Sequence, residues 1–248
     1  VNHVLDHSYG HLLNFLDLRR TVVTCHDLTP LEFEKDDAIK ESFRKVVGNL
    51  KLATKVIADS QETKRDLIKY FGLPDDKIEV ISLGVDPVFH SIDSEEEKQR
   101  IRKKFNLPKG KIIFSHGQAN LAYKNTEGIL RAFIQIALEQ PDVYLLRVNS
   151  LSVPQTEFLK SAGLIERYVE VANPSDEELA ELYNVADVFL APSFKEGFGL
   201  PVLQALACGL PVVISPGGSL EEIAGDCGVY VDPQSTTDMV RGLRGVLS

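Results

Sequence analysis

The clearest candidates for chemistry are Glu196 and the glycines on either side of Phe198, in the segment Lys-Glu-Gly-Phe-Gly at 195–199. Glycine lets a ligand approach the backbone closely, because it has no side chain to block the way. A helix is expected directly after this segment, and the free N–H groups at a helix N-terminus favour an anion. Glu196 would repel a bare anion but can accept hydrogen bonds from hydroxyl groups. The segment therefore predicts a ligand that carries both hydroxyls and phosphate, such as a sugar joined to a phosphate.

A second candidate site lies in the loop His116–Asn125, between a predicted strand and a predicted helix. Lys124 stands at the expected N-terminus of that helix, where a cation is unfavourable by about 0.3–1 kcal/mol. A bound anion would reverse this cost, and Gly117 would permit its close approach. The alternative is an exposed lysine that tolerates the cost. The pattern favours a phosphate site.

A third candidate is His26, followed by Asp27, directly after the β-branched strand Thr21–Cys25. Ligands in open α/β sheets bind at the carboxyl ends of strands, so the pair is well placed for function. The alternative is that Asp27 caps the next turn and His26 fills the loop. The helical spacing of His3, His7 and His11 could indicate a metal site, but a polar loop followed by a short helix is favoured. No metal is predicted.

The elements that would position these residues alternate regularly between strands and helices, which predicts an α/β fold. Pro201 is expected at the first position of the helix after Gly199, and Gly209 just beyond its end. Three pairs have the spacing of a capping box: Asp59 with Glu62, Ser175 with Glu178, and Ser219 with Glu222. The expected strands and longer helices are 21–25, 55–58, 78–81, 111–116, 143–148, 169–171, 187–190, 210–214 and 229–233, and 36–53, 61–71, 154–162 and 177–185.

The composition is that of a globular protein. Of 248 residues, 44% are hydrophobic and 25% are charged, and the net charge of -9 argues against nucleic-acid binding. No apolar run is long enough to span a bilayer, and the three cysteines lack metal-ligand spacing, so reduced thiols and a cytoplasmic location are expected. The basic residues Lys64, Arg65 and Lys69 are interpreted as a solvated face. The alternative is peripheral contact with an anionic inner membrane surface, near a lipid-linked acceptor.

The letters E-G-F-G-L-P-V-L-Q-A-L-A-C-G-L-P-V at 196–212 resemble the signature of retaining glycosyltransferases of family 4, which have the two-domain GT-B fold. The resemblance implies two Rossmann-like domains. It also implies transfer of a hexose from a nucleotide-diphosphate sugar to an acceptor hydroxyl, with retention of anomeric configuration. The acceptor would be a saccharide or a lipid-linked group. Neither a cofactor nor a metal is implied.

The same resemblance assigns roles to individual residues. Glu196 and His26 would contact the donor sugar, with Asp27 behind His26, and Lys124 would hold the diphosphate. Gln204 stands where the family has a second glutamate that contacts the ribose, and a neutral amide would bind more weakly there than a carboxylate. The full set of expected substrate-binding residues is Gly117, Lys124, Glu196, Gly197, Phe198, Gly199, Leu200 and Gln204.

The resemblance also places a domain crossover near Leu83–Pro87, giving domains 1–89 and 90–248. About three strands are expected in the first domain, without the family's N-terminal glycine loop, and the only methionine is Met239. A truncated N-terminal domain is therefore expected. Two alternatives stay open: a nucleotide-sugar-binding domain with impaired catalysis, and a nucleotide-sugar epimerase of the same fold.

Overall fold

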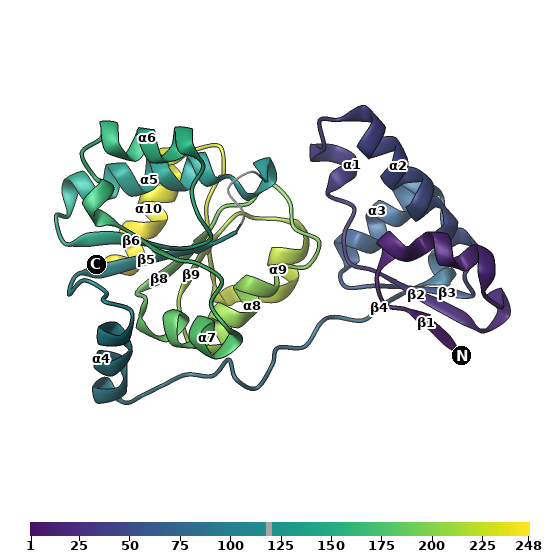
Figure 1. Ribbon diagram of the computed structural model, residues 1–248, viewed down its shortest axis with the longest axis horizontal. Coiled ribbons are helices and arrows are strands. Elements are labelled where there is room, and N and C mark those ends of the chain that lie inside the picture. The colour runs from purple at the N-terminus through teal and green to yellow at the C-terminus, as the bar shows by residue number, and fades with distance from the viewer. Residues whose placement is uncertain (118–120) are drawn as a thin grey trace. The chain divides into compact units, whose positions relative to one another are not determined.

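The computed structural model describes residues 1–117 and 121–248, so Gln118–Asn120 of the predicted phosphate loop lie outside the described residues. The chain divides into two compact units. Unit 1 comprises residues 1–84 together with 195–199, and unit 2 comprises residues 85–194 together with 200–248. Each unit contains its own parallel β-sheet with helices on its faces (Figure 1). The predicted α/β fold with two Rossmann-like sheets is confirmed.

Unit 1 is built on a four-stranded sheet in the order β1-β2-β3-β4, with every neighbouring pair parallel. The carboxyl ends of parallel strands meet at one edge, so the residues after β2 and β3 are neighbours in space. The strands are β1 (Asn2–Val4), β2 (Thr21–Cys25), β3 (Lys55–Ala58) and β4 (Ile78–Val80), and the α-helices are α1 (Pro30–Phe33), α2 (Asp37–Gly48) and α3 (Gln61–Phe71).

Three details of unit 1 differ from the sequence predictions. Asn2–Val4 forms a strand instead of a polar loop, since Val4 packs into the core and pairs with β2. The predicted helix 36–53 ends at Gly48 and continues as a 3₁₀ turn. The predicted cap at Asp59 is wrong: Ser60 caps α3 by accepting a hydrogen bond from the Thr63 N–H. Asp59 is thereby left available for a tertiary partner.

Unit 2 contains a six-stranded parallel sheet in the order β10-β9-β8-β5-β6-β7. The chain builds outward from β5 through β6 to β7, and then returns to the other side of β5 to add β8, β9 and β10. The strand order therefore reverses between β5 and β8, and this switch point is where doubly wound sheets bind their ligands. The strands are β5 (Lys111–His116), β6 (Val143–Val148), β7 (Tyr168–Val171), β8 (Val188–Ala191), β9 (Val212–Ile214) and β10 (Gly228–Tyr230).

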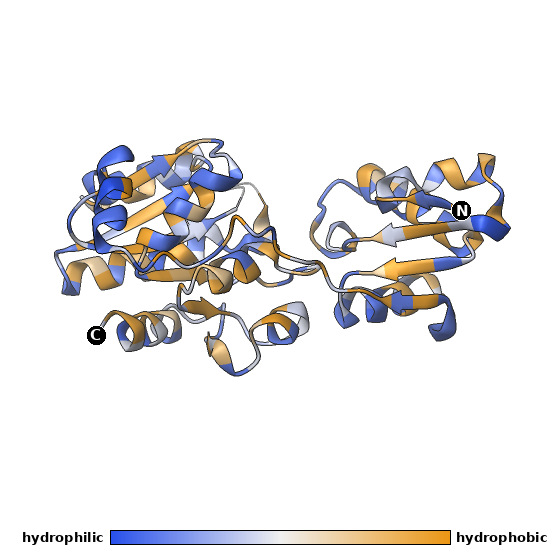
Figure 2. Ribbon diagram, turned by 90° about the horizontal axis from the view of Figure 1, so that it is seen from below, coloured by the Kyte–Doolittle hydropathy of each residue, from blue (hydrophilic) through white to orange (hydrophobic). Residues whose placement is uncertain are grey.

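Helices cover both faces of this sheet (Figure 1). Successive residues of β5 alternate between the two layers: Ile113 packs with α5, α6 and α10, whereas Ile112 and Phe114 pack with α7, α8 and α9. Figure 2 shows the apolar residues along the strands and on the helices that flank them. The helices are α4 (Glu95–Lys104), α5 (Thr126–Glu139), α6 (Val153–Ser161), α7 (Asp176–Val185), α8 (Leu200–Ala207), α9 (Gly218–Ala224) and α10 (Thr236–Leu247).

The helix ends of unit 2 test the capping predictions. The capping box of Ser175 and Glu178 is confirmed at the start of α7. Gly209 ends α8 with a φ of +76°, and its N–H donates to the Leu206 carbonyl, as predicted. Pro201 is the second residue of α8, because the helix already begins at Leu200. The box predicted at Ser219 is wrong, since α9 begins at Gly218 and Gly217 is its N-cap residue, two residues before the predicted cap.

Candidate active site

Each unit holds a separate group of the predicted site residues. In unit 1, His26 follows β2 and Asp59 follows β3, at the edge where parallel strands end together. His26 Nδ1 lies 2.6 Å from Asp59 Oδ2, and His26 Nε2 lies 2.8 Å from the Leu5 carbonyl. Both partners are acceptors, so both ring nitrogens donate and the imidazolium form is favoured. Although partial burial opposes the charge, Asp59 and the Leu5 carbonyl raise the pKa of His26 above its usual value.

This pair makes the stability of unit 1 depend on pH. Because the pKa of His26 is raised by folding, its contribution to stability is complete below about pH 6.5 and is lost as the pH rises through the raised pKa. Above that pKa, the buried Asp59 carboxylate faces a neutral ring. We expect the midpoint temperature of thermal unfolding to decrease as the pH is raised from about 6 to about 9. In Asp59→Asn this decrease should be smaller. Equal slopes in parent and variant would contradict this assignment.

The segment Lys195–Gly199 belongs to unit 1 and contacts the same edge of its sheet. The Gly197 carbonyl accepts hydrogen bonds from Ser60 Oγ at 2.5 Å and from Thr63 Oγ1 at 3.1 Å. A Cβ added to Gly197 would lie 2.5 Å from the His26 carbonyl oxygen and closer still to the Asp27 Cβ. Glycine is therefore required here for contact between two stretches of protein backbone. Ligand access, the reason predicted from the sequence, stays a prediction.

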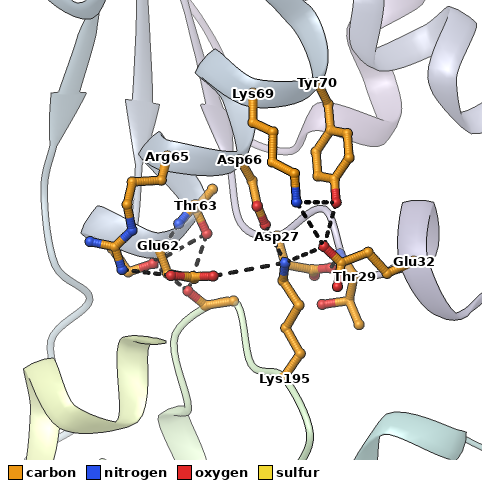
Figure 3. A network of polar contacts seen from close by, with 12 residues as sticks. Asp27, Thr29, Glu32, Glu62, Thr63, Arg65, Asp66, Lys69, Tyr70 and Lys195 are labelled. Atoms are coloured by element: carbon orange, nitrogen blue, oxygen red, sulfur yellow. Dashed lines mark hydrogen bonds and ion pairs between the residues drawn. The ribbon is translucent and has the colours of Figure 1, made fainter. Parts of the chain in front are cut away.

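Lys195 anchors this segment through a cluster of charged residues that the sequence did not predict (Figure 3). Its Nζ lies 2.7 Å from Asp66 Oδ2, 2.8 Å from Glu32 Oε1 and 3.8 Å from Glu62 Oε1. The Lys195 side chain is only 11% exposed. Burial and the neighbouring carboxylates raise the pKa of Asp66, against the opposing effect of Lys195.

Arg65 and Lys69, which the sequence suggested lie on a solvated face, belong to this cluster. Arg65 pairs with Glu62 at 2.5 Å, and Lys69 Nζ lies 3.7 Å from Glu32 Oε1. The cluster therefore contains three carboxylates and three cations, and its formal charge is zero.

Lys195 and Gly197 fix the segment to unit 1 and so determine where its other residues lie. Glu196 is half-buried. Its neighbours in sequence, Lys195 and Gly197, are both bound to other residues of unit 1. Phe198 is buried, and Gly199 adopts a φ of +101°, a conformation that favours glycine. Asp27 Oδ1 accepts a hydrogen bond from the Thr29 N–H, which is the turn-capping role that the sequence left open. Glu196, Gly197 and His26 are thus brought together at one sheet edge.

In unit 2, Gly117 and Lys124 meet at the switch point after β5. A Cβ added to Gly117 would lie 3.5 Å from Lys124 Cγ, so the lysine side chain lies against the glycine. Asn125, with a φ of 53°, caps α5 and also donates to the carbonyls of Pro192 and Pro233. These bonds tie the start of α5 to the segments that follow β8 and β10. The predicted phosphate-binding pair is therefore held at the place where such sheets bind ligands.

Arg147 on β6 also belongs to this region, although its place in a predicted strand did not indicate this. It is 1% exposed, and its guanidinium donates to Ser115 Oγ at 2.7 Å, to the Gly117 carbonyl at 2.6 Å and to Thr126 Oγ1 at 3.2 Å. Burial, followed by the charges of Lys124 and Arg147, lowers the pKa of His116 to about 4. Lys124 and Arg147 thus place two positive charges near the end of β5.

Gln204 and Leu200 lie on α8. Gln204 is buried, and its Oε1 accepts a hydrogen bond of 3.5 Å from the Tyr183 hydroxyl. Leu200 is the first residue of the helix. Among residues 1–117 and 121–248, no group of three or more His, Cys, Asp or Glu side chains is placed to hold a metal ion. Over the same residues, no helix has both the length and the apolar character needed to cross a membrane.

Comparison with known proteins supports one family. Residues 110–248 match the family model described as glycosyl transferases group 1, and residues 1–89 match the model of glycosyltransferase family 4. The serotype-specific mannosyltransferase WbdA of Escherichia coli is 29% identical over 241 residues, which cover 92% of this chain and 29% of the relative. The chain thus spans under a third of that relative's length.

Solved structures show the same fold. Sucrose-phosphate synthase from Thermosynechococcus elongatus superposes with a TM-score of 0.80 at 23% identity, covering 99% of this chain and 63% of the other. Anabaena HepE, in complex with UDP and glucose, gives 0.76 at 20% identity, covering 91% and 61%. The family-model match spans more than half of the residues, so the chain belongs to the glycosyl transferases of group 1, of the family 4 type, and shares their two-sheet α/β fold.

Proposed function

We propose that this chain carries the donor site of a retaining hexosyltransferase. The enzyme would move a hexose from a nucleotide-diphosphate sugar to a hydroxyl of a saccharide or lipid-linked acceptor, without a metal. The observation that carries the proposal is the pairing of Gly117 with Lys124 at the switch point of unit 2. A cation beside a glycine at a helix start suits a diphosphate.

In this mechanism the chain's residues bind and orient the donor. Lys124 neutralises the departing diphosphate, an electrostatic contribution of the kind that dominates many enzymatic rate accelerations. Glu196 accepts hydrogen bonds from the sugar hydroxyls, and His26 contributes positive charge near them. The acceptor hydroxyl attacks the anomeric carbon on the face that the diphosphate leaves. A diphosphate oxygen takes the hydroxyl proton, so no protein nucleophile is needed.

The relatives suggest which donors to try first. WbdA is a mannosyltransferase, and HepE has been crystallised with UDP and glucose. GDP-mannose and UDP-glucose are therefore the first ligands for calorimetric titration, in buffer with a chelator. We expect one of them to bind, and Lys124→Ala to weaken that binding at least tenfold, because the diphosphate would lose its charged partner, a loss of about 1.4 kcal/mol or more.

Lys103→Ala provides the matched control, since Lys103 is an exposed lysine on α4 of the same unit. Its donor affinity should equal that of the parent. Equal affinity of the Lys124→Ala variant and the parent would contradict the assignment of the diphosphate site.

A nucleotide-sugar-binding domain without turnover is the second candidate. Gln204 favours it, because this buried amide contacts Tyr183 and replaces the family's second glutamate. Donor binding without transfer to any acceptor would support this alternative. Gln204→Glu would then be expected to tighten the binding of the nucleotide, since a carboxylate accepts hydrogen bonds from ribose hydroxyls more strongly than an amide.

A further inference from the structure

Arg147 is a buried cation whose bound partners are all neutral. Its guanidinium is bonded to two hydroxyls and one carbonyl, and no described carboxylate forms an ion pair with it. Glu170, its register partner on β7, attracts the guanidinium electrostatically without forming an ion pair, and the Glu170 carboxylate accepts hydrogen bonds from Ser150 and Tyr168. A buried charge is costly unless an opposite charge compensates it. The charge of Arg147 is therefore only partly compensated, and stability alone explains this arginine poorly.

The position of the guanidinium adds to this cost. It donates to Thr126, the first residue of α5, and so lies at the positive end of the dipole of a 14-residue helix. Cations are unfavourable at that end and anions are favourable. Lys124 stands at the same place, two residues before the helix begins. Two cations at one helix start, one of them buried, would both be stabilised by a bound anion.

The bonds of Arg147 also fix the local backbone. Arg147 Nη1 donates to Ser115 on β5, and Nη2 donates to both the Gly117 carbonyl and Thr126 at the start of α5. Gly117 and Thr126, on either side of Lys124 in the sequence, are thus joined through the Arg147 guanidinium. The partial negative charge of the Gly117 carbonyl is bound to the guanidinium, which reduces its repulsion of a phosphate.

We propose that Arg147 is a positioning residue for the donor diphosphate: it fixes the Gly117 backbone and supplies buried positive charge behind the anion site. This inference rests on the proposed function, because the anion is taken to be the diphosphate of the donor. It extends that function by a residue outside the loop, on the neighbouring strand.

The test compares variants that separate charge from hydrogen bonding. Arg147→Lys keeps the charge, whereas Arg147→Gln is neutral but can still donate from its amide. Arg147→Met is a second neutral variant. The test needs only one of the two neutral variants to be folded, as shown by cooperative unfolding. Titrations use UDP, GDP and inorganic pyrophosphate. We expect the neutral variants to bind diphosphate at least tenfold more weakly than the parent, and Arg147→Lys to recover binding to within about threefold.

Arg167→Met is the matched control, because Arg167 is another arginine of unit 2 that donates to a backbone carbonyl, that of Ala137. It should bind like the parent. A folded neutral variant that binds within twofold of the parent would overturn the proposal. A parent that binds pyrophosphate but no nucleoside diphosphate or sugar nucleotide would contradict the proposed function and leave the role of Arg147 measurable. A parent that binds none of them would overturn both.

Discussion

Replacing Lys195 by methionine is expected to lower the free energy of unfolding of unit 1 by about 3–5 kcal/mol, the usual cost of removing one partner from a buried ion pair. The variant would leave Asp66, Glu32 and Glu62 facing one another without the cation that they share. Urea denaturation followed by circular dichroism measures the change.

The decrease in the free energy of unfolding caused by Lys195→Met should depend on pH. The pKa of Asp66 is already raised by burial, and without Lys195 it would rise further. An acid whose pKa is raised by folding regains stability as the pH falls, so the deficit should shrink between about pH 7 and about pH 4.5. Lys69→Met is the control within the same cluster, because Lys69 is exposed and should matter little. Equal losses in the two variants would show that the burial of Lys195 is unimportant.

Gly197→Ala is expected to lower the rate of the proposed sugar transfer by about 100-fold, because a displacement of about 1 Å in a catalytic segment can have that effect. The new Cβ would meet both Asp27 and the His26 carbonyl, within the 3.0 Å that real Cβ atoms keep from other atoms. The segment would have to move, and Glu196 would move with it. Initial rates of transfer, measured at saturating donor, give the size of the effect.

Gly48→Ala is the matched control, because Gly48 lies in α2 of the same unit and a Cβ there would have no atom within 4 Å. Its transfer rate should equal that of the parent, and its stability should be equal or slightly higher. If Gly197→Ala also kept the parent's rate, the segment could shift without consequence, and its contact with β2 would have no catalytic importance.

Local patterns were sufficient to predict most of the architecture. Runs such as Lys111–His116 are apolar enough to be recognised as buried strands, and Gly209 ends α8 because its left-handed conformation suits glycine. The short strand Asn2–Val4 was missed because its three residues include two polar ones. Strand identity there depends on pairing with β2, which a local pattern does not reveal.

Residues of the candidate sites that are neighbours in sequence could be singled out from the sequence, and their roles stay predictions. Gly117 and Lys124 lie in one loop, and Glu196 and Gly197 are adjacent. Lys195 was unpredictable, since its partner Glu32 is 163 residues away. Asp59 and Ser60 are adjacent residues that can both cap a helix, and the tertiary hydrogen bond that Asp59 accepts from His26 decides between them. Arg147 lies within a predicted strand, and its position in the sequence does not reveal the hydrogen bonds that its guanidinium forms in the folded sheet.

The sequence of unit 1 is discontinuous, and this bears on the order in which the protein is made. A ribosome delivers residues 1–84 more than a hundred residues before it delivers Lys195. Until then Asp66 and Glu32 lack the ammonium group that neutralises them in the finished fold. The N-terminal sheet therefore reaches its full stability only after most of unit 2 has left the ribosome. Completion of the N-terminal fold is in this way coupled to synthesis of the segment that carries Glu196.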